Sequence, residues 1–186
     1  MRVLGVSGSL RQASHNRALL RAAAALLPPD VELAEYDRLK AIPPFDEDDE
    51  SDPPGAVGEW RTAIADADAI LFATPEYNSS VPGQLKNAID WASRPFTETV
   101  LRNKPVAVIG ASTSMFGAVW AQAELRKALA AAGARVVDRE LPVAGAAEAF
   151  DERGRLLDED SSLELESILA ELLDEVRQRA GVALKR

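Results

Sequence analysis

Cysteine is absent from the 186-residue sequence. Its absence excludes disulfide bonds, thiolate zinc sites, iron–sulfur clusters and cysteine nucleophiles. His15 is the single histidine, so a metal site built from several histidines is excluded, and a Ser-His-Asp triad would have to use this one residue. A chain without cysteine suits a reducing compartment, and we expect a cytoplasmic location.

Basic side chains are outnumbered by acidic ones. The chain has 21 lysines and arginines against 30 aspartates and glutamates, a formal net charge of −9. This charge repels polyanions, so neither nucleic acid nor a membrane surface is expected as a partner. Long apolar runs are also missing, because no stretch approaches the roughly 20 residues of a membrane span or the apolar part of a secretory signal. The acidic run 46–52 is interpreted as a solvated surface loop.

The overall composition is that of a globular protein, with 47% apolar and 27% charged residues. A chain of this length usually forms one domain. We predict a single domain over residues 1–186, with its core in about 1–145 and a C-terminal helix over 160–180.

Short apolar runs alternate with segments of helical periodicity. Strands are predicted over 3–6, 31–36, 69–73, 105–111 and from 135 toward 143. Helices are predicted over 16–27, around 60–67, and over 82–93, 120–132 and 163–176. Strands separated by helices of about ten to fifteen residues require parallel crossovers. The sequence therefore predicts an α/β fold, a doubly wound five-stranded parallel sheet with helices on both faces.

The loop after the first predicted strand is rich in hydrogen-bond donors. Residues 8–16 have the sequence GSLRQASHN, which lacks both the G-x-G-x-x-G spacing and the Gly-Lys-Ser/Thr of a P-loop. Ser9, Ser14 and Asn16 supply neutral donors, Arg11 supplies a charged one, and the next helix adds its positive end. This set suits a terminal phosphate monoester. The structural alternative is that Ser14 or Asn16 caps the helix, and one residue can do both.

A second polar loop follows the third predicted strand. Residues 74–82 have the sequence TPEYNSSVP, in which Pro75 and Pro82 stiffen the chain. A rigid turn of this kind can present backbone groups to the edge of a planar heterocycle while Tyr77 covers apolar surface. The structural alternative is that Tyr77 is a surface aromatic and Pro75 a turn former.

Together the two loops resemble the NAD(P)H-dependent FMN reductase family. The resemblance rests on the motifs Gly8-Ser9-x-Arg11-x-x-Ser14-x-Asn16, Pro75-Glu76-Tyr77-Asn78, Pro82-Gly83-x-Leu85-Lys86-Asn87-Ala88-x-Asp90-Trp91 and Ala121-Gln122-x-x-Leu125-Arg126. That family has a flavodoxin-like fold and includes quinone, azo-dye and chromate reductases. The resemblance therefore implies a flavodoxin-like sheet, bound FMN, and NADPH or NADH as electron donor.

The resemblance also implies which residues bind FMN. These are Ser9, Leu10, Arg11, Ser14, Asn16, Pro75, Glu76, Tyr77, Asn78, Ser112, Thr113, Ser114 and Gly117. The first loop would hold the phosphate, the second would line the isoalloxazine, and the loop around 112–117 would touch the ring or the ribityl chain. Relatives often have glycine where this chain has Ser114. Either flavin binding differs from theirs or the position tolerates serine without consequence.

In this interpretation the cofactor carries the chemistry and no catalytic side chain is required. Hydride passes from the nicotinamide to N5 of FMN and then, by a ping-pong mechanism, to a quinone, free flavin, azo compound or similar acceptor. Two alternatives stay open: a flavodoxin-like electron carrier and a phosphate-loop interaction module without flavin. Arg11 argues against the carrier, because such carriers usually hold the phosphate with neutral loops.

Family members form dimers or tetramers, so a homodimer or homotetramer is expected. The helix 82–93 carries a stripe that should face the sheet, made of Leu85, Ile89 and Ala92. Trp91 lies off this stripe, and the structural alternative is that Trp91 and Trp120 belong to the core. We therefore predict that a monomer exposes Trp91, that a symmetric dimer buries it, and that the second chain completes the flavin pocket. Arg126 either pairs across that boundary or is solvated on its own helix.

Overall fold

The structure, a computed structural model, describes residues 1–183. Within these residues one parallel sheet has the strand order β2-β1-β3-β4-β5, and β6 pairs with β4 on the same side as β5. The strands are β1 (Arg2–Ser7), β2 (Glu32–Glu35), β3 (Ala69–Thr74), β4 (Pro105–Ala111), β5 (Arg135–Val136) and β6 (Pro142–Val143). This is the flavodoxin-like order, so the predicted fold class is confirmed, with six short strands in place of five.

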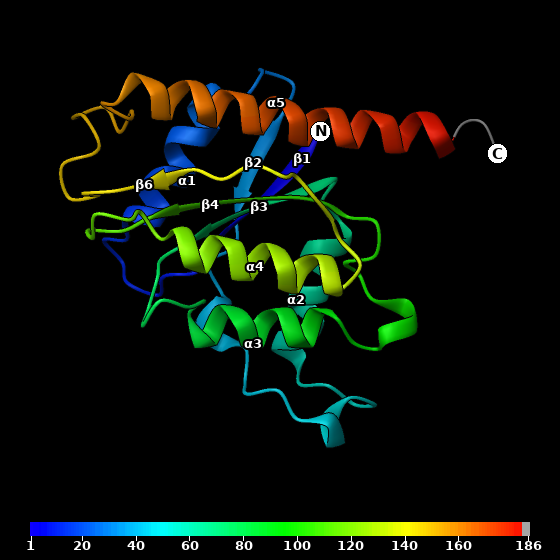
Figure 1. Cartoon of the computed structure of the whole chain (residues 1–186). Coiled ribbons are helices and arrows are strands. Elements are labelled where there is room, and N and C mark those ends of the chain that lie inside the picture. The colour runs from blue at the N-terminus through cyan, green and yellow to red at the C-terminus, as the bar shows by residue number, and fades with distance from the viewer. Residues whose placement is uncertain (184–186) are drawn as a thin grey trace.

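Helices cover both faces of the sheet (Figure 1). On one face lie α1 (His15–Leu26) and α5 (Glu159–Ala183), and on the other lie α2 (Gly55–Ala65), α3 (Gly83–Ala92) and α4 (Val119–Ala131). Single 3-10 turns occur at Leu39–Ala41, Glu47–Asp49 and Phe96–Glu98. The sequence predicted these helices to within a few residues, except that α2 begins earlier and α5 is longer than its apolar stripe.

The two faces of the sheet form two separate hydrophobic layers. On β3, Ile70 and Phe72 pack toward α2, α3 and α4, whereas Leu71 and Ala73 pack toward α1 and α5. Every residue of β3 and β4 is buried. Strands covered on both faces have no polar side, which explains why these two appear in the sequence as continuous apolar runs.

The prediction that Trp91 is exposed is wrong. The side chain is fully buried, its Nε1 donates to the carbonyl of Pro43 at 2.9 Å, and Phe45 packs edge-on against it at 4.9 Å between ring centroids. The cover is a segment that precedes α2 in the chain. Asn87 on α3 holds it by donating to the Pro43 carbonyl at 2.8 Å and accepting from the Phe45 N–H at 2.7 Å. The helical pattern of α3 alone contains no sign of this segment.

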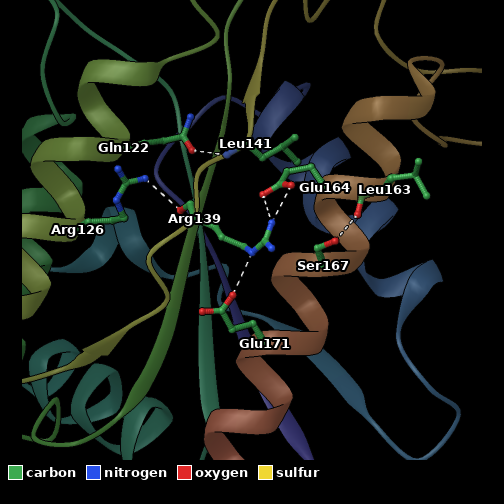
Figure 2. Close-up of polar contacts among 8 residues, drawn as sticks. All are labelled: Gln122, Arg126, Arg139, Leu141, Leu163, Glu164, Ser167 and Glu171. Atoms are coloured by element: carbon green, nitrogen blue, oxygen red, sulfur yellow. Dashed lines mark hydrogen bonds and ion pairs between the residues drawn. The ribbon is translucent and has the colours of Figure 1, made fainter.

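The last predicted strand is interrupted at the sheet edge. Residues 138–140 leave the sheet between β5 and β6, although the sequence predicted a strand running from 135 toward 143. On either side of them, Val137 and Leu141 still form backbone hydrogen bonds with β4. Figure 2 shows Arg139 reaching from this segment to α5, where it pairs with Glu164 at 2.9 Å and Glu171 at 3.0 Å. The exposed ion pairs attach the segment to α5.

The same segment is attached to α4 from the opposite side (Figure 2). Gln122, which is fully buried, accepts from the Leu141 N–H at 3.0 Å. Arg126 donates to the Arg139 carbonyl at 3.0 Å and pairs with Glu140 at 3.0 Å. Arg126 thus finds its acidic partner within its own chain.

In the acidic run 46–52, every residue except Glu50 is exposed, as predicted, whereas Glu50 is half-buried and pairs with Arg94 at 3.7 Å. Asp46 caps the short turn there by accepting from the Asp48 N–H at 3.0 Å. Among the described residues, no group of three acidic or histidine side chains is arranged to hold a metal ion. Within the same part of the chain, no helix is both long and apolar enough to span a bilayer.

Candidate functional site

Three loops meet at the carboxyl edge of the sheet and enclose a cavity of about 290 Å³. They follow β1, β3 and β4, and the cavity lies where the strand order reverses beside β1, the usual ligand position in such sheets. The lining residues are Ser9, Arg11, Ser14, His15, Asn16, Pro75, Glu76, Tyr77, Ala111, Ser112 and Thr113. Four predicted site residues lie outside this lining, namely Leu10, Asn78, Ser114 and Gly117.

Ser14 forms the N-cap of α1. Its backbone is extended, and its Oγ accepts from the N–H groups of Asn16 at 3.2 Å and Arg17 at 3.4 Å. The hydroxyl hydrogen is not used in these bonds, so Ser14 can cap the helix and still donate to a bound anion. Because the cap lines the cavity, the positive end of the α1 dipole lies beside it.

Asn16 joins two of the loops. Its side chain is buried, its Nδ2 donates to the Ala111 carbonyl at 2.9 Å, and its Oδ1 accepts from the Ala111 N–H at 2.9 Å. This bidentate pair attaches the start of α1 to the last residue of β4. Only one amide hydrogen of Asn16 is left for a ligand. Its first role is therefore to fix the spacing between the first and third loops.

Arg11 and Ser9 complete the polar end of the cavity. Arg11 is exposed, and within the described part of the chain it takes part in no ion pair. Ser9 is buried, and its N–H donates to Ser7 Oγ at 3.3 Å, which leaves its own hydroxyl to line the cavity. An unpaired guanidinium, two hydroxyls and a helix N-terminus form a donor set that fits a phosphate monoester.

The second loop is a tight hairpin. Tyr77 and Ser80 exchange backbone hydrogen bonds of 3.1 and 3.2 Å, and Asn78 and Ser79 between them are left-handed, with φ of 53° and 59°. These are features of a type I′ turn. The turn leaves the Tyr77 ring half-exposed at the cavity. Asn78 sits at the tip, outside the lining, where asparagine suits the left-handed backbone.

In the third loop, the hydroxyls of Ser112 and Ser114 lie 3.0 Å apart, and Ser112 Oγ also accepts from the Ser114 N–H at 3.2 Å. Ser114 is not among the residues with positive φ, so its backbone does not require glycine. Gly117 does require it, since its φ is 56° and an added Cβ would collide with the backbone of Pro142. Gly117 therefore allows the loop to pass under β6.

Glu76 lines the cavity and also contacts the helix α4. It lines the cavity, and its Oε2 accepts from the backbone N–H of Ala121, in the first turn of α4, at 3.1 Å. This contact could not be predicted from the sequence, because the two residues are 45 positions apart. Two lining residues, His15 and Ala111, were not predicted. Ala111 is the last residue of β4, and its position at a strand end was the available signal.

Comparison with known proteins identifies the family. The profile described as NADPH-dependent FMN reductase matches residues 1–148. An NAD(P)H-dependent FMN reductase of Pseudomonas aeruginosa is 44% identical over 97% of this chain and 98% of its own. A 2-hydroxy-1,4-benzoquinone reductase of a Burkholderia species is 36% identical over 96% of this chain and 98% of its own.

A solved structure supports the same family assignment. FerB, a flavoenzyme NAD(P)H:(acceptor) oxidoreductase from Paracoccus denitrificans, is similar with a TM-score of 0.83 and 34% identity, over 95% of this chain and 97% of FerB. The resemblance seen in the first two loops is confirmed by these matches, which extend over nearly the whole chain. The chain belongs to the NADPH-dependent FMN reductase family.

Proposed function

We propose that this chain is an FMN-dependent NAD(P)H oxidoreductase that reduces small planar acceptors. The observation that carries the proposal is the cavity at the reversal of strand order, whose lining combines the anion-binding groups Ser14 and Arg11 with the aromatic side chain of Tyr77. The P. aeruginosa and Burkholderia relatives support the same activity.

Each loop has a separate task in this proposal. The first loop holds the phosphate with the Arg11 guanidinium, the Ser9 and Ser14 hydroxyls and the N-terminus of α1. Pro75, Tyr77 and Thr113 line the rest of the cavity and would border the flat part of the ligand. Bound FMN supplies the hydride-transfer chemistry, so the protein contributes orientation and electrostatics.

The acceptor class follows from the relatives, of which one is named a benzoquinone reductase. We propose quinones, free flavins and azo compounds as acceptors, each taking the place that the oxidised nicotinamide leaves. Parallel lines in double-reciprocal plots of the steady-state rate would support this ping-pong order, and intersecting lines would contradict it.

The preferred flavin distinguishes this proposal from other nucleotide-binding roles. The donors of the first loop surround a terminal phosphate, so FMN should bind more tightly than FAD, whose phosphate carries an adenylate. Titration of the flavin-free protein, followed by flavin fluorescence, measures both dissociation constants. Equal affinity for FMN and FAD would contradict the proposal, and a colourless protein that takes up neither would favour a phosphate-loop module.

Turnover separates an enzyme from an electron carrier. The purified holoprotein should oxidise NADH or NADPH continuously when a quinone is present. A protein that binds FMN but shows no such turnover with either nicotinamide would be a carrier.

We also propose that the chain acts as a homo-oligomer, at least a dimer, with the second copy bordering the cavity. Buried Trp91 plays no part in this contact. Exposed aromatics lie elsewhere, at Phe116 and Trp120, whose rings pack at 4.9 Å between centroids beside the third loop. The Ala128 and Ala131 side of α4 forms an open groove with α3 next to Lys86. A second copy placed on this face would cover both features.

A further inference from the structure

The helix α4 has no N-cap of its own. It begins at Val119, and the preceding residue, Ala118, is left-handed with φ of 64° and ψ of 32°. Helices usually start after Ser, Thr, Asp or Asn, whose side-chain oxygen accepts from the second or third helical N–H. The methyl group of Ala118 cannot accept a hydrogen bond, and it is fully buried.

Glu76 supplies the missing acceptor from another loop. Its Oε2 lies 3.1 Å from the N–H of Ala121, the third residue of α4. This is the amide that a local cap would satisfy. A carboxylate at this place is also favoured by the positive end of the helix dipole. Although Glu76 lines the cavity, its negative charge thus lies at the N-terminus of α4.

A second bond links the same hairpin to α4. Ser80 Oγ donates to Glu124 Oε2 at 2.5 Å. Glu124 lies three residues after Ala121, so both links lie on one side of the helix. The hairpin residue Tyr77 lies between the two anchored positions in the chain, next to the cavity.

We propose that Glu76 is a positioning residue, which caps α4 from the second loop and thereby fixes the Tyr77 hairpin against the start of α4. The expected effect on flavin binding rests on the proposed function. The cap itself is a property of the chain without flavin. The two can therefore be tested apart.

The cap is tested first in the full-length protein without flavin, by amide hydrogen exchange of Ala121 measured by NMR. Loss of an N-cap typically corresponds to about a fivefold change in local opening, so Glu76→Ala should raise the exchange rate about fivefold. Glu76→Asp keeps the charge but shortens the reach, and should raise it similarly. Glu76→Gln keeps an acceptor of the same length and should restore most of the protection.

Glu124→Ala is the control, because it removes one negative charge and the Ser80 link to α4 but leaves the acceptor of the Ala121 N–H in place. It should leave Ala121 exchange close to that of the unchanged protein. Equal exchange at Ala121 in the unchanged protein, Glu76→Ala and Glu76→Asp would overturn the cap. If Glu76→Ala does not fold, the comparison of Glu76→Asp with Glu76→Gln decides the same question.

The positioning role is tested next with FMN. Glu76→Ala and Glu76→Asp should raise the FMN dissociation constant severalfold and alter the visible circular dichroism of the bound flavin, while Glu76→Gln should resemble the unchanged protein. A lost cap with unchanged FMN affinity and unchanged dichroism would overturn the positioning role. Failure of the unchanged protein to bind FMN would instead refute the proposed function, with the exchange result at Ala121 still standing.

Discussion

Arg11 is the positive side chain that the first loop places at the cavity, where it is exposed and lies beside the N-terminus of α1. We expect Arg11→Ala to raise the FMN dissociation constant about ten- to a hundredfold, because a charge-assisted hydrogen bond contributes roughly 1.5–3 kcal/mol. Fluorescence titration measures the change. Arg21→Ala, which removes an exposed arginine from α1, should leave the constant unchanged. An unchanged constant in Arg11→Ala would mean that the hydroxyls and amides alone hold the phosphate.

Asn16 has a structural task that can be measured without any ligand. Replacing it with alanine leaves the N–H and carbonyl of Ala111 unpaired in a buried position. We expect Asn16→Ala to lower the free energy of unfolding of the flavin-free protein by about 2–4 kcal/mol. Urea denaturation gives this value. Gln12→Ala, an exposed amide of the same loop, should change stability by less than about 0.5 kcal/mol. Similar effects of the two variants would contradict the assigned role.

At the scale of single residues, the sequence predicted the residue types that form the site better than it predicted which of them line the cavity. Ser9, Arg11 and Ser14 line the cavity as the donor pattern indicated. Asn78 in the second loop and Gly117 in the third were also predicted to bind FMN, but they take left-handed backbone conformations and neither lines the cavity. A motif records which residue types occur, and it does not say whether a residue serves the ligand or the backbone that presents it.

The end of α2 is stabilised by a buried cation. Lys104, which is 4% exposed, donates its Nζ to the carbonyls of Ala65 and Ala67, just where α2 ends. Burial lowers the pKa of Lys104 below its ordinary value of 10.5, and nearby Arg179 acts in the same direction. The unfolded chain therefore binds more protons than the folded one at alkaline pH. Lys104 should make the free energy of unfolding rise with pH as pH approaches 10.5.

The prediction concerns the difference in the free energy of unfolding between the unchanged protein and a variant that lacks the Lys104 amine. The free energy of unfolding of the unchanged protein minus that of Lys104→Met should increase over the alkaline range as pH rises toward 10.5. Urea denaturation at several pH values measures it. Subtracting the variant removes the contribution of other alkaline groups such as Tyr36, whose pKa is raised by burial. A difference that stays flat or falls over this range would show that burial does not lower this pKa.

At the scale of elements, the sequence was informative wherever the local pattern of residues determines the secondary structure. Continuous apolar runs identified β3 and β4, and helical periodicity predicted the end of α1 to within one residue. The sequence was uninformative where contacts with distant segments of the chain determine the structure. The cover over Trp91 comes from the Pro43 region, and the break between β5 and β6 is held by α4 and α5. Periodicity within one element contains no information about such partners.

At the scale of the whole molecule, the proposed dimer gives a direct prediction. Light scattering at micromolar concentration should show no monomer. Trp120→Asp should shift the population toward monomer and lower turnover while leaving the flavin-free melting temperature nearly unchanged, because the ring is exposed in the single chain. Leu157→Asp, an exposed apolar residue on the segment before α5, is the control and should not dissociate the assembly.

A substitution at Trp91 is expected to act differently from Trp120→Asp. Because it is fully buried, Trp91→Asp should lower the melting temperature rather than release folded monomers. A fully active monomer of the unchanged protein would refute the dimer and leave the flavin assignment intact.

The two borders of the sheet also limit how copies of this chain can join. At one border β2 has four residues, with exposed glutamates at both ends. At the other, β5 and β6 have two residues each, separated by the segment that Arg139 fastens to α5. Neither border presents a long row of free backbone N–H and carbonyl groups, which is what edge-to-edge strand addition and fibril growth require. We therefore expect folded copies to associate through surfaces other than these two strand edges, even at the high concentrations at which sheet proteins tend to aggregate.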